Sequence, residues 1–199
     1  MRAVAATPNA VVLGRSGYDN GPVTVAGLRL LGSPDPSARR EGAGDVNTPP
    51  EDLQAEGEAL LSRYRASDPP PDIVCVHNPR QAAPLLGTAK VVLCGHMHRA
   101  YVETESGTVV CNAGTTGASG ARYFERAEGV PFSAALLHFL PGDAEGWRRR
   151  PRLLFIDQVV LQGSLSEYSI TRRTFGNGPH APDGGENGDT AAGVPAQIP

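Results

Sequence analysis

The chain has 199 residues, with 18 Lys and Arg against 21 Asp and Glu and a formal net charge of −3. This balance argues against a basic surface for nucleic acid as the main binding feature. No segment approaches the roughly 18–20 consecutive apolar residues of a membrane span. The high content of Gly (24) and Pro (18) predicts many turns.

The first third of the chain predicts a hairpin, a loop and a helix after a short apolar run at residues 10–13. Residues 22–31 alternate apolar and polar side chains around Ala26-Gly27, which predicts two short antiparallel strands. The polar, Gly- and Pro-rich segment 32–50 predicts a loop. Residues 51–66 predict a helix with acidic residues in its first turn. Its apolar side would consist of Leu53, Leu60, Leu61 and Tyr64.

The middle of the chain has the pattern of a βαβ unit. Residues 73–76 and 91–94 are short, fully apolar runs of the kind found in strands buried on both faces. Residues 79–86 between them predict a short helix with Pro near its start. Since a crossover of this kind joins parallel strands, we expect the two strands to be parallel neighbours or near neighbours.

The pattern changes to antiparallel strands after residue 98. Residues 101–111 predict a hairpin with a Ser106-Gly107 turn. Three further strands are predicted at 132–140, 152–161 and 166–174, and the polar segment 141–151 separates the first two. Residues 176–199 have almost no large apolar side chain and predict a disordered tail, which leaves a folded domain over residues 1–175.

Three histidines follow the two strands of the predicted βαβ unit. His77 comes directly after the run 73–76, whereas His96 and His98 follow the run 91–94 after Gly95. Ligands bind at the carboxyl ends of strands in open α/β sheets. In an extended segment His96 and His98 would point the same way, and Gly95 would allow a sharp turn and a close approach to a metal. Three imidazoles could thus hold zinc, manganese or iron.

The other histidines and the cysteines have less specific interpretations. His138 lies within a predicted strand and is expected to be a structural residue, and His180 lies in the predicted tail. Cys75 and Cys94 are in apolar runs and are expected to be buried thiols, which suits a reducing compartment. Because the N-terminus also lacks the apolar core of a signal peptide, we expect a cytoplasmic location.

At this point the sequence resembles the calcineurin-like metallophosphoesterase family. Four segments carry the resemblance, in the family's order and spacing, over roughly residues 8–174. Gly95-His96-Met97-His98 looks like the Gly-His-x-His motif, and residues 73–79 look like the strand and histidine that precede it. Cys111-Asn112-Ala113-Gly114-Thr115 is similar to the segment that follows, and residues 27–36 resemble the strand and Asp-Pro loop of a bacterial branch whose members often carry N-terminal membrane helices.

The resemblance implies the C-terminal part of a four-layer α/β sandwich, a βαβ unit followed by antiparallel strands. It implies that His77 and His96 bind one metal of a two-metal centre and His98 the other, and that the substrate is a phosphate mono- or diester attacked by metal-activated water. The family's Asp-x-His, Gly-Asp and Gly-Asn-His-Asp motifs are not present in this sequence. We therefore expect a C-terminal fragment that is inactive alone.

Charge decides how many metals these residues could hold. Two divalent cations about 3.5–4 Å apart repel strongly, so a dinuclear centre would form only if further ligands were supplied. One metal could bind the three histidines with an open water position. Asp35 is the one carboxylate in a loop that could approach them, although a turn residue beside two prolines is the favoured interpretation.

Two other functions stay open beside the phosphoesterase. The chain could be a non-catalytic, histidine-based metal-binding module, or a structural remnant that associates through an exposed sheet edge. The sequence does not distinguish between substrates or between manganese, iron and zinc.

Overall fold

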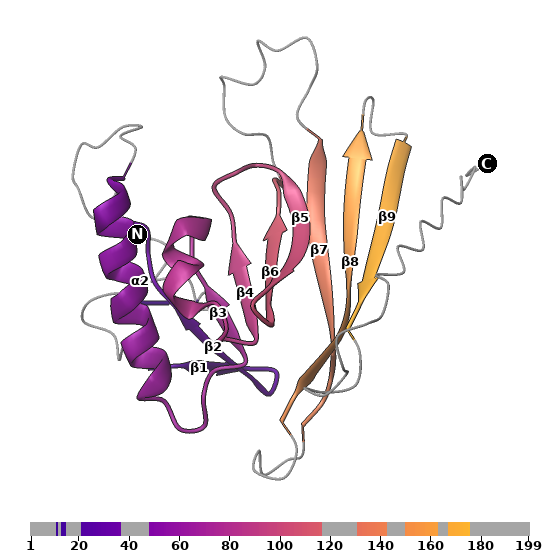
Figure 1. Cartoon of the computed structure of the whole chain (residues 1–199). Helices are drawn as coiled ribbons and strands as arrows, with labels where there is room; N and C mark the ends of the chain where they lie inside the picture. Colours follow the sequence, from indigo (N-terminus) through magenta and orange to yellow (C-terminus); the bar gives the residue numbers. More distant parts are fainter. Residues whose placement is uncertain are drawn as a thin grey trace. The chain divides into compact units, whose positions relative to one another are not determined.

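The computed structural model describes residues 11, 13–14, 21–36, 48–116, 131–142, 150–162 and 167–175. Within them the chain is mixed α/β, with a mixed six-stranded sheet and an antiparallel three-stranded sheet (Figure 1). It divides into two compact units, Met1–His96 with Glu103–Val110 and Met97–Val102 with Cys111–Pro199. The predicted α/β class is therefore confirmed.

The predicted first hairpin is present. Strands β1 (Val23–Val25) and β2 (Leu28–Gly32) pair antiparallel, with Val25 opposite Leu28. Ala26 and Gly27 between them both have positive φ angles, 48° and 80°. Two central residues with positive φ form the type I′ turn, whose twist matches that of the flanking strands.

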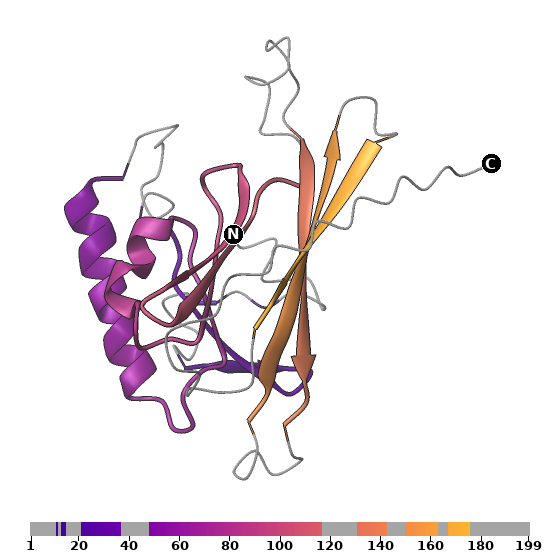
Figure 2. The same cartoon turned by 45° about the vertical axis from the view of Figure 1, so that its right-hand side comes forward.

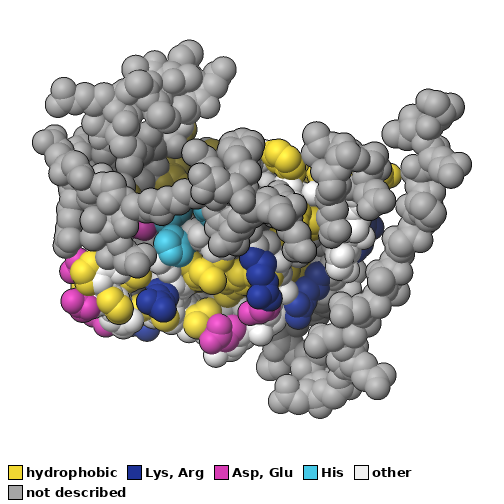
Figure 3. Space-filling model, turned by 90° about the horizontal axis from the view of Figure 1, so that it is seen from above, with side chains coloured by type: hydrophobic (Ala, Val, Ile, Leu, Met, Phe, Trp, Pro, Cys, Tyr) yellow, Lys and Arg dark blue, Asp and Glu magenta, His cyan; other side chains and the backbone are white. Residues whose placement is uncertain are grey.

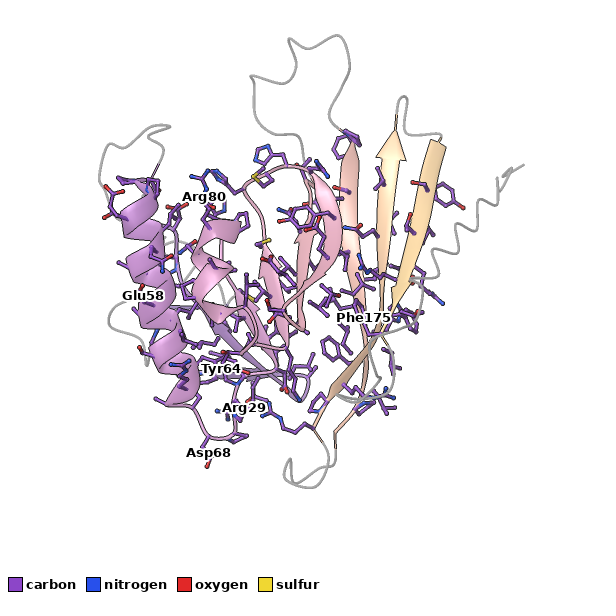
Figure 4. All side chains as sticks on the ribbon, viewed as in Figure 1. Arg29, Glu58, Tyr64, Asp68, Arg80 and Phe175 are labelled. Carbon is purple, nitrogen blue, oxygen red and sulfur yellow. The ribbon has the colours of Figure 1, made fainter. Side chains whose placement is uncertain are left out.

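Helix α2 (Pro50–Arg65) confirms the predicted helix to within one residue at each end. Pro50 occupies the start, where its missing N–H costs no hydrogen bond, and Glu51 and Asp52 lie in the first turn. Its buried side consists of Leu53, Gly57, Leu60 and Tyr64, whereas Leu61 is only half-buried. Figure 4 shows Tyr64 at the end of the helix opposite to its start.

The predicted βαβ unit is confirmed, with one difference in its helix. Strands β3 (Ile73–Cys75) and β4 (Val91–Cys94) are parallel, with Val74 opposite Val92. The connection η2 (Pro79–Leu85) is a 3₁₀ helix. Pro84 lies inside it and cannot donate a backbone hydrogen bond, which favours a short, tight helix. Figure 2 shows α2 and η2 on the same side of these strands.

Strand β2 also runs parallel to β3, a pairing that the local sequence pattern does not predict. Leu30 lies opposite Ile73 and Gly32 opposite Cys75. α2 is thus a crossover helix like η2. Three parallel strands therefore end at one edge of the sheet, and the segments after Gly32, Cys75 and Cys94 leave from it.

The second predicted hairpin completes the large sheet. Strands β5 (Ala100–Glu105) and β6 (Thr108–Ala113) are joined by Ser106 and Gly107, both with positive φ. The strand order is β1-β2-β3-β4-β6-β5. The Thr108 hydroxyl is buried, donates to the Ala89 carbonyl at 2.6 Å and accepts from the Gly87 amide at 2.9 Å.

The three last predicted strands form the small sheet. β7 (Phe132–Leu140), β8 (Arg152–Gln162) and β9 (Glu167–Thr174) pair antiparallel in the order β7-β8-β9. The register shifts between His138 and Phe139. Ile156 on the central strand is fully buried, whereas Leu136, Tyr168 and Ile170 are about half exposed.

Some predictions lie outside the described residues. These are the disordered tail at 176–199 with the domain boundary before it, most of the loop 32–50 and most of the segment 141–151. In the part of the chain that is described, no helix is long and apolar enough to cross a membrane.

All three cysteines are thiols and not parts of disulfides. Cys94 and Cys111 are buried, as expected for Cys94, whereas Cys75 is only partly so. Desolvation nevertheless raises the pKa of Cys75 to about 11. A thiol with such a pKa is poorly nucleophilic at neutral pH, so Cys75 has a structural rather than a reactive character.

Candidate metal centre

The candidate site lies in the first unit, where the parallel strands β2, β3 and β4 end. His77 follows β3, and His96 follows β4 after Gly95. The sheet pairing continues beyond the strands, since the Val76 amide donates to Leu93 O at 3.0 Å and the Gly95 amide to His77 O at 2.9 Å. These bonds hold the two histidine-bearing segments side by side.

The two imidazoles contact each other directly. His77 Nε2 lies 3.3 Å from His96 Nδ1, and the rings meet edge to face with centroids 5.2 Å apart. Both residues are exposed, and Figure 3 shows histidine side chains at the surface next to an acidic side chain. The sequence analysis expected these two imidazoles to converge together with that of His98.

The separation of the two nitrogens fits joint ligation of one metal ion. Two zinc–nitrogen bonds of about 2.0–2.1 Å at a tetrahedral angle place their nitrogens about 3.3–3.4 Å apart. The observed 3.3 Å falls in this range. A hydrogen bond between a neutral imidazole N–H and the other ring's nitrogen has a similar length, so the same separation also suits the metal-free pair.

Asp35 supplies a carboxylate next to this pair. Its Oδ2 lies 3.9 Å from His77 Nε2, and its other oxygen, Oδ1, accepts a hydrogen bond of 2.8 Å from the Thr48 hydroxyl. The Asp35 side chain is largely buried, with 12% of its surface exposed. Both interpretations of Asp35 from the sequence, a turn residue and a possible ligand, are compatible with this position beside His77.

Gln81 fixes the relative position of the two loops that carry Asp35 and His77. This fully buried side chain donates to Pro34 O at 3.2 Å and accepts from the Asn78 amide at 3.1 Å. Asn78 in turn accepts from the Arg80 amide at 3.0 Å and caps η2. Sequence reasoning missed Gln81, although the spacing Asn78-x-x-Gln81 is the signature of a capping box.

The backbone at His96 differs from the expected extended segment. His96 and His98 have positive φ angles of 67° and 52°, whereas Gly95 does not adopt the left-handed region. The conformational freedom expected of Gly95 is thus not used, and a Cβ there would make only ordinary contacts. The left-handed conformation falls on the histidines themselves, and such backbone strain clusters at functional sites.

His98 belongs to the second unit, with the segment Met97–Val102. It is half-buried. Within the described ranges, no three His, Cys, Asp or Glu side chains form a ready-made metal-binding group. The structure thus brings His77, His96 and Asp35 near one another, but not in a finished ligand geometry.

In the second unit, the Asn112 segment forms a tight turn. The Asn112 side chain is fully buried and accepts from the Gly114 amide at 3.0 Å. Gly114 has a φ of 78°, and a Cβ there would lie 2.0 Å from the Ser133 hydroxyl. This turn therefore requires glycine.

His138 lies in strand β7, as expected. It stacks on Phe155 at 4.1 Å between ring centroids, and its Nε2 lies 3.2 Å from Asp157 Oδ2. Asp157 also accepts two hydrogen bonds from Arg172, at 2.6 and 2.7 Å. These bonds hold the pKa of Asp157 below its ordinary value. His180 lies outside the described residues.

Comparison with known proteins does not assign this chain to a family. No protein-family model matches the chain. A search of curated proteins finds no significant match either.

Proposed function

We propose that this chain takes part in metal-dependent phosphoester hydrolysis, with a divalent ion held by His77, His96 and Asp35. The observation that carries the proposal is the 3.3 Å separation of His77 Nε2 and His96 Nδ1 beside the Asp35 carboxylate. Two imidazoles and one carboxylate are a donor set that zinc uses in hydrolytic sites and that manganese and iron also accept.

Each residue has a distinct task in this proposal. His77 and His96 provide neutral nitrogen donors from two adjacent strand ends, and Asp35 provides negative charge that offsets part of the ion's charge. Thr48 holds one oxygen of Asp35 and leaves the other directed toward His77. A divalent ion would supply Lewis acidity and an activated water for attack on phosphorus. Both histidines are exposed, so an ion held by them would be accessible from solvent.

The four-layer sandwich fold is also part of this proposal. The resemblance to calcineurin-like metallophosphoesterases implies a four-layer sandwich, in which His98 would serve a second ion. Asp35 supplies a single carboxylate beside His77, so a second ion would need further acidic ligands. We therefore expect one ion per chain. A single ion can still activate a water, so we expect slow hydrolysis where the missing motifs alone led us to expect none. A cytoplasmic location is also part of the proposal and rests on the three thiols.

The second candidate is a metal-binding module without catalysis. The same three donors favour this candidate. Two imidazoles and one carboxylate can bind a single ion tightly even if the protein has no groups that position a phosphate ester. The two candidates share the metal site and differ only in turnover.

Hydrolysis of p-nitrophenyl phosphate and bis(p-nitrophenyl) phosphate with added Mn²⁺, Fe²⁺ or Zn²⁺ tests the proposal. We expect a metal-dependent rate that is lost in His96→Ala and Asp35→Asn and kept in His138→Ala. Equal rates in wild type and His96→Ala would refute the phosphoesterase. Metal binding without any turnover would favour the binding module.

A further inference from the structure

The last strand of the small sheet has an open edge. Among the described residues, β9 pairs with β8 on one side, and the order β7-β8-β9 leaves its other side without a strand (Figure 1). Tyr168 and Ile170 on this strand are 48% and 46% exposed. An eight-residue edge with exposed apolar side chains is a template for another strand.

The hydrogen bonds to β8 show which backbone groups point toward the open side. The Phe175 amide donates to Leu154 O at 2.9 Å, so these opposed residues form a hydrogen-bonded pair. Such pairs alternate along an antiparallel ladder. Hence Tyr168, Ile170, Arg172 and Thr174 direct their N–H and C=O groups away from β8.

We propose that β9 pairs antiparallel with β9 of a second copy of this chain, about a two-fold axis at Ile170. In this register Ile170 exchanges both backbone hydrogen bonds with Ile170 of the second copy. Tyr168 and Arg172 do the same with Arg172 and Tyr168 of the second copy. All six bonds use groups that point outward, and the two small sheets become one six-stranded sheet.

The side chains favour this register over its neighbours. It places Ile170 directly opposite Ile170 of the second copy, an apolar cross-strand pair. A shift of the axis to Thr171 would place Arg172 against Ile170 instead. Arg172 is also neutralised within its own chain, since it donates two hydrogen bonds to Asp157. Arg172 therefore adds little charge repulsion to the pairing.

The association state of the full chain tests this interface directly. Light scattering after gel filtration, from about 5 to about 300 µM, should show a concentration-dependent dimer. Ile170→Pro removes an outward N–H that β8 does not use, a position where an edge strand tolerates proline. It should be monomeric with an unchanged circular dichroism spectrum. Ile170→Thr keeps the N–H and should still dimerise. A wild-type monomer at the highest concentration would overturn the proposal, as would a dimer of Ile170→Pro.

Oxidative cross-linking tests the register and does not depend on the proline variant. Ile170→Cys should cross-link to itself, because the two Cα atoms of such a pair are about 5.5 Å apart. Tyr168→Cys should not, since its copy lies four residues away along the partner strand. Wild type provides the background from its own three thiols. Equal cross-linking of both variants, or of neither, would overturn the proposed axis.

Discussion

His77 Nε2 and His96 Nδ1 lie 3.3 Å apart although 19 residues separate them in the chain. The contact arises because β3 and β4 are parallel neighbours and each histidine follows its strand after one residue, Val76 or Gly95. Backbone hydrogen bonds beyond the strand ends keep the two segments in register. The pairing is thus a property of the sheet and does not depend on a long flexible loop.

Thr48→Val should weaken metal binding without touching a ligand. The Thr48 hydroxyl holds Oδ1 of Asp35 at 2.8 Å, and outer hydrogen bonds of this kind change metal affinity by about 10–100-fold. We expect about a tenfold loss for Thr48→Val and a larger one for Asp35→Asn, measured by calorimetric titration with Zn²⁺. Thr24→Val, at an exposed position of β1, is the control and should bind as wild type. Unchanged affinity in Asp35→Asn would exclude Asp35 as a ligand.

Gly57→Ala should destabilise the protein, although alanine is the better helix former by about 1 kcal/mol. A Cβ at Gly57 would lie 2.5 Å from the Gln81 carbonyl oxygen and 3.0 Å from Pro84 Cδ. Overpacking of this kind costs about 1–3 kcal/mol, which urea unfolding would detect.

The control for Gly57→Ala is the opposite change, from Ala to Gly, at an exposed position of the same helix. Ala59→Gly should lower the free energy of unfolding by about 1 kcal/mol through helix propensity alone. A stabilised Gly57→Ala would show that α2 does not pack closely on η2.

Asp157→Asn should reduce stability at neutral pH but not in strong acid. Hydrogen bonds from Arg172 and the proximity of His138 lower the pKa of Asp157 from its ordinary 3.8. A carboxylate with a lowered pKa in the folded state contributes stability above the unfolded pKa and loses it as the pH falls through the folded value. The melting temperatures of wild type and Asp157→Asn should therefore differ at pH 7 and draw together as the pH falls below 3.8.

Glu103→Gln, at an exposed position of β5, is the matched control for Asp157→Asn and should melt like wild type at both pH values. A difference between wild type and Asp157→Asn that stays constant down to pH 3 would show that the carboxylate charge is not what stabilises this cluster.

The sequence predicts local elements well because their signals are local. Ala26-Gly27 marks the first turn, the pattern from Leu53 to Tyr64 marks the helix, and the apolar runs before His77 and His96 mark two buried strands. It does not predict the place of Asp35, because that depends on β2 lying beside β3, a pairing between segments about 40 residues apart. Nor does it predict the left-handed backbone of His96, which the chain adopts only in its tertiary context.

X-ray absorption of the zinc-loaded chain tests the central claim most directly. We expect about one zinc per chain, with imidazole nitrogens at about 2.0–2.1 Å and one imidazole fewer in His77→Ala and in His96→Ala. His138→Ala, which alters a histidine of the small sheet, should leave the spectrum unchanged. Zinc bound with the same number of imidazoles in the double variant His77→Ala/His96→Ala would contradict a metal centre at these strand ends.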